Sequence, residues 1–294
     1  MVYGLPAIAS ALGSSTTAEI NVLEGNGWIV DDQRPATPGY KKTKYNDAIQ
    51  SIKNVLNYLN VDTTSNRLHI RFSGDLVAAS GVGASAAQCT SLARALNDTF
   101  NLNLDDEQIN NAAYEGEKAY HGTPSGIDNT ASTFGGLIWF RKNLNGKKNT
   151  INLLNSPIKM PFVIGNTGAT ASTSEVVAYV RRLMNENPEK FKKIFNNYEN
   201  LAQNARIALL NGNIEEIGSL MNQNHKLLQE ISVSGEINDL LVQIALNNGA
   251  IGAKMTGTGR GGLIIALVEN AEVQEKVYNS IMNEGFTAWK TTIG

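Results

Sequence analysis

The chain has 294 residues, of which 42% are hydrophobic and 18% are charged, and its formal net charge is −2. These values are typical of a globular protein with one large domain or two ordinary ones. The near-neutral charge and the lack of a Lys/Arg cluster argue against nucleic acid as a partner. No apolar run approaches the roughly 18 residues that cross a membrane, and no basic residue precedes the apolar Met1–Gly13, so neither a membrane span nor a secretory signal is expected.

The single cysteine, Cys89, excludes an intramolecular disulfide and indicates a reducing compartment, so we expect a cytoplasmic protein. Cys89 falls on the apolar face of an expected helix, where a thiol usually acts as a small hydrophobic group. The three histidines, His69, His121 and His225, are far apart and show no metal-binding spacing.

Periodicity, turn residues and caps predict a chain of alternating strands and helices without repeats or a disordered linker. In chain order we expect strands at 18–23 and 28–30, a loop at 31–44, a helix at 46–59, a strand at 69–72, helices at 85–99 and 106–120, a helix start near 126, strands at 137–140 and 161–165, helices at 188–211, 214–231 and 235–248, a strand at 263–268, a helix at 271–284 and a strand at 286–292. Asp105 or Asp106 is expected to cap the helix at 106–120.

This pattern favours two α+β lobes that meet near residues 145–160. We therefore expect an N-terminal domain at 1–155, which carries a glycine loop, and a C-terminal domain at 156–294.

The glycine loop, Ser80-Gly-Val-Gly-Ala-Ser-Ala-Ala at residues 80–87, contains no bulky side chain and leads directly into a helix. A helix N-terminus presents unpaired N–H groups and a partial positive charge, so it can hold an anion such as phosphate. The loop has no lysine, which excludes the G-x-x-x-x-G-K-[ST] phosphate loop.

Three interpretations of this loop remain open. Gly81, Gly83 and Ala86 match G-x-G-x-x-A, but a dinucleotide site also needs a parallel strand soon after the helix, and a second helix follows instead. A tight strand-to-helix turn without a ligand is equally compatible. The third interpretation is a different nucleotide site, in which Ser85 offers its hydroxyl to a metal on the phosphates.

A second segment, residues 115–129, carries two carboxylates suited to phosphoryl transfer. Glu117 lies near a helix end, where the dipole disfavours a carboxylate unless a cation such as Mg²⁺ offsets it. Asp128 follows a Pro-Ser-Gly turn and can reach a hydroxyl nucleophile. A solvated helix end and a capping aspartate are the simpler explanation.

A third segment, Lys254–Gly262, places four glycines just before a buried strand. Glycines allow the backbone to approach a ligand or another backbone closely. A packing turn without a ligand explains the same pattern.

Together and in this order, the three segments closely resemble the GHMP-type small-molecule kinases, and among them the mevalonate kinase family. The family's phosphate loop corresponds to Ser80–Ala87, its H-G-x-P-S-G-x-D-N segment to His121–Asn129, and its C-terminal glycine loop to Lys254–Gly262. Val30–Gly39 and the Gly-Thr-Gly-Arg-Gly-Gly variant are most similar to the protist-type branch. The resemblance spans essentially the whole chain.

The resemblance implies a two-lobed α+β GHMP kinase fold, with an N-terminal lobe like domain 2 of ribosomal protein S5 and a ferredoxin-like C-terminal lobe. It implies ATP and Mg²⁺ as cofactors, with Ser85 and Glu117 as metal ligands. Asp128 would lie beside the 5-hydroxyl of mevalonate, as a catalytic base or as an orienting charge. The residues expected at the nucleotide phosphates are Ser80, Gly81, Val82, Gly83, Ala84, Ser85 and Ala86. Those expected on the substrate side are Tyr3, Ser172, Thr173, Gly257, Thr258 and Gly259.

The sequence departs from the family pattern at three places. Ala84 replaces the first serine of a usual pair, and Arg260, whose guanidinium could approach phosphate or face solvent, interrupts a loop that is often all glycine. The chain also begins at Met1-Val-Tyr-Gly, inside a stretch that follows the family's lysine and Glu-His pair. We therefore expect a truncated sequence with low activity and an open sheet edge.

The function implied is ATP-dependent phosphorylation of (R)-mevalonate to 5-phosphomevalonate in isoprenoid and sterol biosynthesis, by a monomer or homodimer whose partner is this small molecule. Another kinase of the superfamily, acting on phosphomevalonate, homoserine or galactose, is the nearest alternative. A non-catalytic homologue that binds a ligand is the alternative of a different class.

Overall fold

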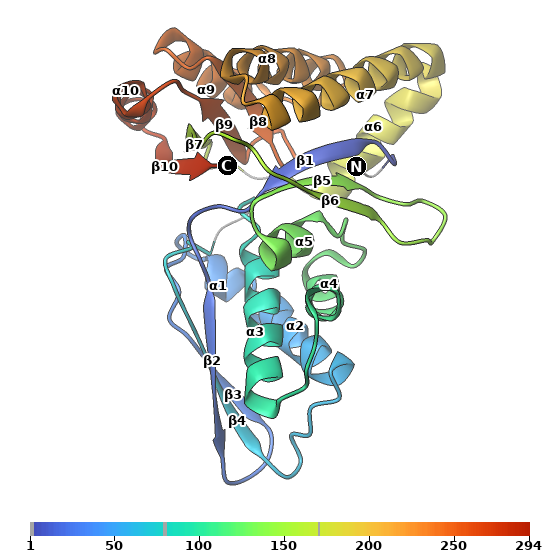
Figure 1. Ribbon diagram of the computed structural model, residues 1–294, viewed down its shortest axis with the longest axis vertical. Helices are drawn as coiled ribbons and strands as arrows, with labels where there is room; N and C mark the ends of the chain where they lie inside the picture. The colour runs from blue at the N-terminus through green and yellow to red at the C-terminus, as the bar shows by residue number, and fades with distance from the viewer. Residues whose placement is uncertain (1–2, 79–80, 170) are drawn as a thin grey trace. The chain divides into compact units, whose positions relative to one another are not determined.

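A computed structural model describes residues 3–78, 81–169 and 171–294, without the side chains of positions 173 and 174. The chain forms two compact units. The glycine-loop unit is Ser14–Gly135, and the split unit combines Met1–Gly13 with Gly136–Gly294. The split unit is discontinuous in sequence, whereas the glycine-loop unit is continuous. The expected division into consecutive domains at 1–155 and 156–294 stays a prediction. Figure 1 labels the helices and strands of each unit.

The glycine-loop unit packs helices on a three-stranded sheet of order β2-β4-β3. Its strands are β2 (Thr17–Leu23), β3 (Trp28–Asp32) and β4 (Arg67–Ser73), and its helices are α1 (Tyr40–Thr43), α2 (Tyr45–Tyr58), α3 (Ala84–Phe100), α4 (Asp106–His121) and α5 (Ile127–Phe134). Strand β2 is antiparallel to β4, whereas β3 is parallel to it, because α2 carries the chain back between β3 and β4. Helix α3 packs against β2 and α4, as Figure 1 shows.

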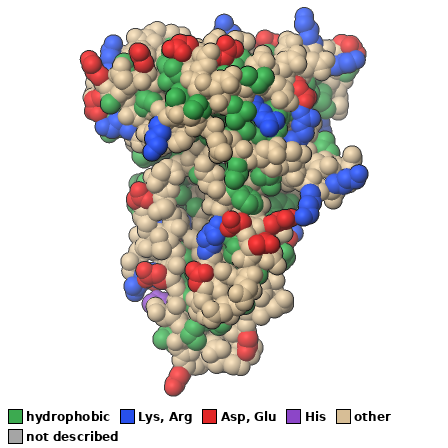
Figure 2. All heavy atoms as spheres, in the orientation of Figure 1, with side chains coloured by type: hydrophobic (Ala, Val, Ile, Leu, Met, Phe, Trp, Pro, Cys, Tyr) green, Lys and Arg blue, Asp and Glu red, His purple; other side chains and the backbone are tan. Residues whose placement is uncertain are grey.

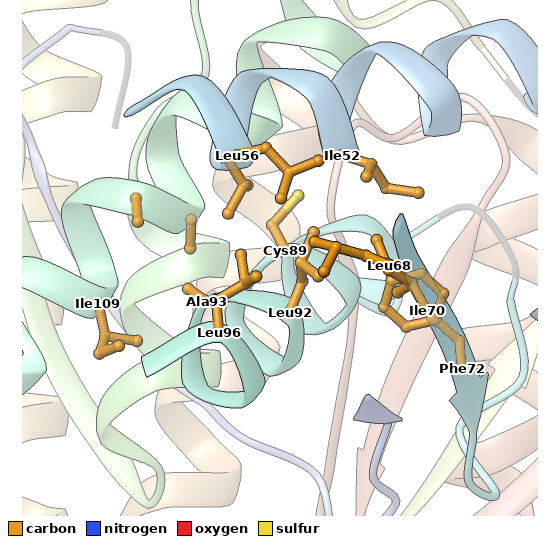
Figure 3. Packing of buried hydrophobic residues seen from close by; sticks show 13 residues of the cluster. Ile52, Leu56, Leu68, Ile70, Phe72, Cys89, Leu92, Ala93, Leu96 and Ile109 are labelled. Carbon is orange, nitrogen blue, oxygen red and sulfur yellow. The ribbon is translucent and has the colours of Figure 1, made fainter. Parts of the chain in front are cut away.

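The core of this unit lies between β4, α2 and α3. Alternate residues of β4, from Leu68 to Phe72, are buried, as expected for a strand with one covered face. Figure 3 shows Cys89 of α3 among these side chains, below Ile52 and Leu56 of α2. Cys89 is only 1% exposed and burial raises its pKa well above the usual value, so it acts here as the expected small hydrophobic group.

The split unit contains two sheets. The first has the order β1-β5-β6, with β1 (Pro6–Ser10), β5 (Leu137–Arg141) and β6 (Thr150–Leu154). The second has the order β10-β7-β9-β8, with β7 (Met160–Asn166), β8 (Gly252–Thr256), β9 (Leu263–Leu267) and β10 (Thr287–Ile293). All neighbouring strands in both sheets are antiparallel.

Long helices cover these sheets. They are α6 (Thr173–Glu186), α7 (Pro188–Asn211), α8 (Ile214–Glu230), α9 (Glu236–Asn247) and α10 (Ala271–Asn283). Figure 1 shows α7 and α8 side by side, in agreement with their packing. One core joins α9 and α10 to the β8 and β9 strands, and a second joins α7 and α8 to β5 and β7.

On the face drawn in Figure 2, acidic and basic side chains are interspersed. That view agrees with the near-neutral net charge. Among the described residues, no helix combines the length and apolar character that crossing a membrane requires.

Candidate active site

The glycine loop ends at an uncapped helix. Gly81 and Gly83 both have positive φ, of 92° and 70°, which glycine adopts without the strain that a side chain would bring. Gly83 is the N-cap of α3, and as a glycine it has no side chain to hydrogen-bond to the first N–H groups of that helix. Ala84 and Ala86 are buried and direct no bulk toward the loop. This arrangement leaves the α3 N-terminus able to bind an anion.

Glu117 of α4 is a buried carboxyl with an unsatisfied oxygen. The residue is 1% exposed, and its Oε1 has no hydrogen-bond partner among the described residues. Burial raises the pKa of Glu117 to about 7, the Ser85 hydroxyl opposes this shift by hydrogen bonding, and the charge of Asp128 adds to it. His121 Nε2 lies 3.7 Å from Oε2. A buried carboxylate with an unpaired oxygen and a nearby hydroxyl is a donor set that fits a hard divalent cation.

Asp128 lies in the first turn of α5, beside the glycine loop. A Cβ added to Gly83 would lie 3.9 Å from Asp128 Cβ, an ordinary packing distance. Solvent reaches the Asp128 side chain. Desolvation by the protein atoms around the carboxyl nevertheless raises the pKa of Asp128 above its usual value, and the charge of His121 opposes this shift. The structure therefore brings Ser85, Glu117 and Asp128 close together near the N-terminus of α3. Their expected roles at a metal and a substrate stay predictions.

No group of three or more His, Cys, Asp or Glu side chains suited to a metal occurs in the part of the chain that the structure describes. A metal at the glycine loop would therefore depend on Ser85 and Glu117 and on oxygens from its ligand. Ser80, which we expected at the phosphates, lies outside the described residues, and so does the side chain of Thr173.

The C-terminal glycine loop belongs to the split unit and is fixed by its backbone. Gly259 has a φ of 81°, and a Cβ added there would lie 2.2 Å from the carbonyl oxygen of Val233. Asn238, which is fully buried, accepts from Gly261 N at 2.7 Å and donates to Gly261 O at 2.8 Å. The glycines thus serve close backbone approach here, whether or not a ligand also binds.

Other predicted substrate-side residues are engaged within the split unit. The hydroxyl of Tyr3 donates to the carbonyl of Val177 at 3.2 Å. The Ser172 side chain caps α6 by accepting a hydrogen bond from Glu175 N. Gly257 has a positive φ of 78°, and Thr258 also interacts with a neighbouring group. Their roles at a substrate stay predictions.

Arg260 is held within the split unit. Its guanidinium lies 4.1 Å from the centre of the Tyr179 ring, and its Nε donates to the carbonyl of Ser232 at 3.1 Å. In the structure, the Arg260 side chain is therefore stacked on Tyr179 at the protein surface, and an approach of its guanidinium to phosphate stays a prediction.

Sequence reasoning missed two buried polar residues that shape these loops, Asn238 and Arg34. Asn238 lies within a helical pattern that gives no sign of a partner 23 residues away. Arg34 lies in an expected loop and bonds to Ala84 and Gln88, 50 and 54 residues further on. No spacing rule connects such distant positions.

Comparison with known proteins matches the chain to two family models. The GHMP kinases N terminal domain covers residues 46–136, and the GHMP kinases C terminal domain covers residues 205–288. The first range contains the glycine loop, Glu117 and Asp128, and the second contains the C-terminal glycine loop. The chain therefore belongs to the GHMP kinases, a family of ATP-dependent enzymes with a two-lobed α+β fold.

Within that family, the chain is similar along nearly its whole length to mevalonate kinases. It is 31% identical to the mevalonate kinase of Thermococcus sibiricus, with 97% of this chain and 89% of that protein aligned. It is 30% identical to the mevalonate kinase of Pyrococcus furiosus, over 100% and 91% of the two chains. The crystal structure of L. major mevalonate kinase in complex with R-mevalonate matches with a TM-score of 0.95 and 38% identity, over 99% of this chain and 90% of that one.

Proposed function

We propose that this chain transfers the γ-phosphoryl group of ATP to the 5-hydroxyl of (R)-mevalonate, forming 5-phosphomevalonate and ADP. The observation that carries the proposal is the whole-chain similarity to L. major mevalonate kinase, at 38% identity and a TM-score of 0.95. The compact arrangement of Ser85, Glu117 and Asp128 supports it, because phosphoryl transfer needs a phosphate cradle, charge neutralisation and a group beside the nucleophile.

The phosphates of ATP would bind at the Gly81–Gly83 loop and the uncapped N-terminus of α3, whose N–H groups and dipole favour negative charge. Ser85 and Glu117 would hold Mg²⁺, which neutralises charge on the phosphates when bound. The unpaired Oε1 of Glu117 is the observation that fits a cation there, because an ionised carboxylate without a partner is costly to bury.

Asp128 would act on the hydroxyl of the substrate. In the transfer, a bond forms between the 5-oxygen and the γ-phosphorus while the bond to the leaving ADP oxygen breaks. The hydroxyl proton must leave, and the accessible carboxylate of Asp128 can accept it or orient the hydroxyl. The raised pKa of Asp128 brings this carboxyl closer to neutrality than an ordinary aspartate.

A coupled assay of ADP release tests the proposal. The chain, incubated with ATP and Mg²⁺, is given mevalonate, phosphomevalonate, homoserine or galactose in parallel. We expect turnover with mevalonate that exceeds turnover with each of the others. Preference for another alcohol would assign a different substrate, and calorimetric binding of ATP without turnover of any would indicate a ligand-binding homologue.

A further inference from the structure

One short segment holds the glycine loop at both ends. Before the loop, Ala78 pairs with Ala36 in a parallel bridge. In that bridge Ala78 N donates to Pro35 O at 2.7 Å, and Thr37 N donates to Ala78 O at 3.2 Å. After the loop, Arg34 Nη1 donates to the carbonyl of Ala84, the first residue of α3, at 3.3 Å. The separation of the two loop ends is therefore set by one stretch of backbone and one side chain.

The guanidinium of Arg34 is itself rigidly held. Arg34 is 6% exposed, and its Nε and Nη2 donate to the two carboxylate oxygens of Asp32 at 2.9 and 2.8 Å. The group also lies 5.4 Å from the centre of the Phe72 ring. A guanidinium that forms a bidentate ion pair with a carboxylate and also stacks on an aromatic ring is held in a single orientation. A lysine ammonium cannot make the same set of contacts.

The network continues from Arg34 into three helices. Arg34 Nη2 donates to Gln88 Oε1 of α3 at 2.6 Å, and the hydroxyl of Tyr120 in α4 donates to the same oxygen at 3.2 Å. Gln88 Nε2 donates to the hydroxyl of Ser51 in α2 at 3.1 Å. Gln88 and Ser51 are 2% and 1% exposed, so solvent cannot replace these bonds. Tyr120 lies about one turn after Glu117, so the network connects α3 and α4, the helices that carry Ser85 and Glu117.

We propose that Arg34 is a positioning residue for nucleotide binding: it fixes the N-terminus of α3 and the exit of the glycine loop relative to α4, without contacting the nucleotide. The inference rests on the proposed function, in which the phosphates bind at this helix end. Loss of Arg34 would leave Gln88 and the Ala84 carbonyl without their common donor and would let the loop ends separate. A phosphate site built from aligned backbone N–H groups binds its nucleotide less tightly when the segments that carry those groups become more mobile.

Binding of MgADP, measured by titration calorimetry, tests the inference independently of turnover. Arg34→Met should raise the Kd for MgADP about tenfold, because a buried charge-assisted hydrogen-bond network is lost. Arg34→Lys keeps the positive charge but not the planar guanidinium with its paired N–H donors. Its Kd for MgADP should lie between those of Arg34→Met and the wild type. In steady-state assays the KM for ATP should rise in parallel, while the KM for mevalonate changes by less than about twofold.

Arg94→Met is the matched control. Arg94 lies on α3, the helix that Arg34 contacts through Ala84 and Gln88, and its Nη2 donates to Asp106 and to the carbonyl of Thr133 rather than to residues that hold the glycine loop. This variant should retain the wild-type Kd for MgADP. If Arg34→Met does not fold, Gln88→Met decides the question by the same titration, because it leaves Arg34 in place and removes its acceptor, together with the bond from Gln88 Nε2 to Ser51.

An unchanged Kd in Arg34→Met would overturn the inference, as would an equal loss in Arg94→Met or an equal rise in both KM values. If instead the wild-type protein binds no MgADP, the proposed function itself fails. The two failures are therefore distinguishable.

Discussion

Burial of the Glu117 carboxyl couples the candidate site to the stability of the fold. Its Oε1 has no partner in the described part of the chain, and burial shifts its pKa from 4.5 to about 7. Between these values the folded state of the metal-free protein binds more protons than the unfolded state. Its stability therefore falls as pH rises through this range. The full shift corresponds to about 3 kcal/mol at most.

We expect Glu117→Gln to remove most of this pH dependence. In EDTA, the free energy of unfolding by urea should fall from pH 5 to pH 8 in the wild type and stay flatter in the variant. Glu115→Gln, on the same helix but in an exposed pair with Lys118, should behave as the wild type. Parallel curves for the wild type and Glu117→Gln would show that the carboxyl is not buried as described.

Asp128 is the second residue that admits a sharp test. Replacement by Asn keeps the size of the side chain and removes the proton acceptor beside Gly83. We expect kcat to fall by about 10²–10⁴-fold, the usual contribution of a general base, while the Kd for MgADP stays within about twofold. Single-turnover kinetics measures the first quantity and calorimetry the second. A kcat within tenfold of the wild type would limit Asp128 to orientation of the substrate.

At the scale of elements, close packing of α4 against α3 and α2 positions Glu117. Gly116 makes this approach possible, because a Cβ there would lie 2.6 Å from Cys89 Sγ and 2.8 Å from Val55 Cγ2. We expect Gly116→Ala to destabilise the glycine-loop unit by about 1–2 kcal/mol, since overpacking outweighs the better helix propensity of alanine. Hydrogen exchange of the most protected α3 amides measures this loss.

A second substitution checks the cause. Cys89→Ala removes the sulfur that the new methyl group meets, so the double variant should recover part of the lost stability. Cys89→Ala alone provides the reference. Strictly additive losses in the double variant would contradict the proposed steric origin.

The elements that could be predicted from sequence are those with their own local signal. The helix expected at 106–120 is α4, Asp106–His121, and Asp105 caps it together with Gln108 as a capping box. Strand β1 had no such signal, because Pro-Ala-Ile-Ala-Ser shows no alternation and becomes a strand by pairing with β5. Strand β6 lies in the stretch where the sequence suggested a lobe boundary.

The residues at the candidate site likewise differ in whether a local sequence pattern could predict them. Gly83, Glu117 and Asp128 lie in motifs whose spacing is local, so the sequence could predict them as site residues. The structure places them near one another, and their roles stay predictions. Arg34 and Asn238 have partners far along the chain, and their identity depends on tertiary structure. Their roles in positioning loops could not be read from a pattern.

At the scale of the whole molecule, the chain crosses between units twice. Residues before Ser14 belong with residues after Gly135, although they are adjacent in sequence to the glycine-loop unit. Strand β1 pairs with β5, and the carbonyl of Pro6 accepts from the Tyr198 hydroxyl of α7 at 2.8 Å. Each unit has cores of its own, so we expect each to respond separately to a local disturbance.

Ile8 and Ile20 provide a matched pair to test this topology. Both are partly buried isoleucines on strands, but Ile8 packs on the core shared by β5, α7 and α8, and Ile20 on the core of the glycine-loop unit. A carboxylate buried at either position should cost about 2–4 kcal/mol. In hydrogen exchange read peptide by peptide, Ile8→Asp should loosen β5 and α7 and spare β4 and α3, and Ile20→Asp should do the reverse. If Ile8→Asp loosened β4 as much as β5, the first residues of the chain would belong to the unit that follows them in sequence, and the division at Ser14 would be wrong.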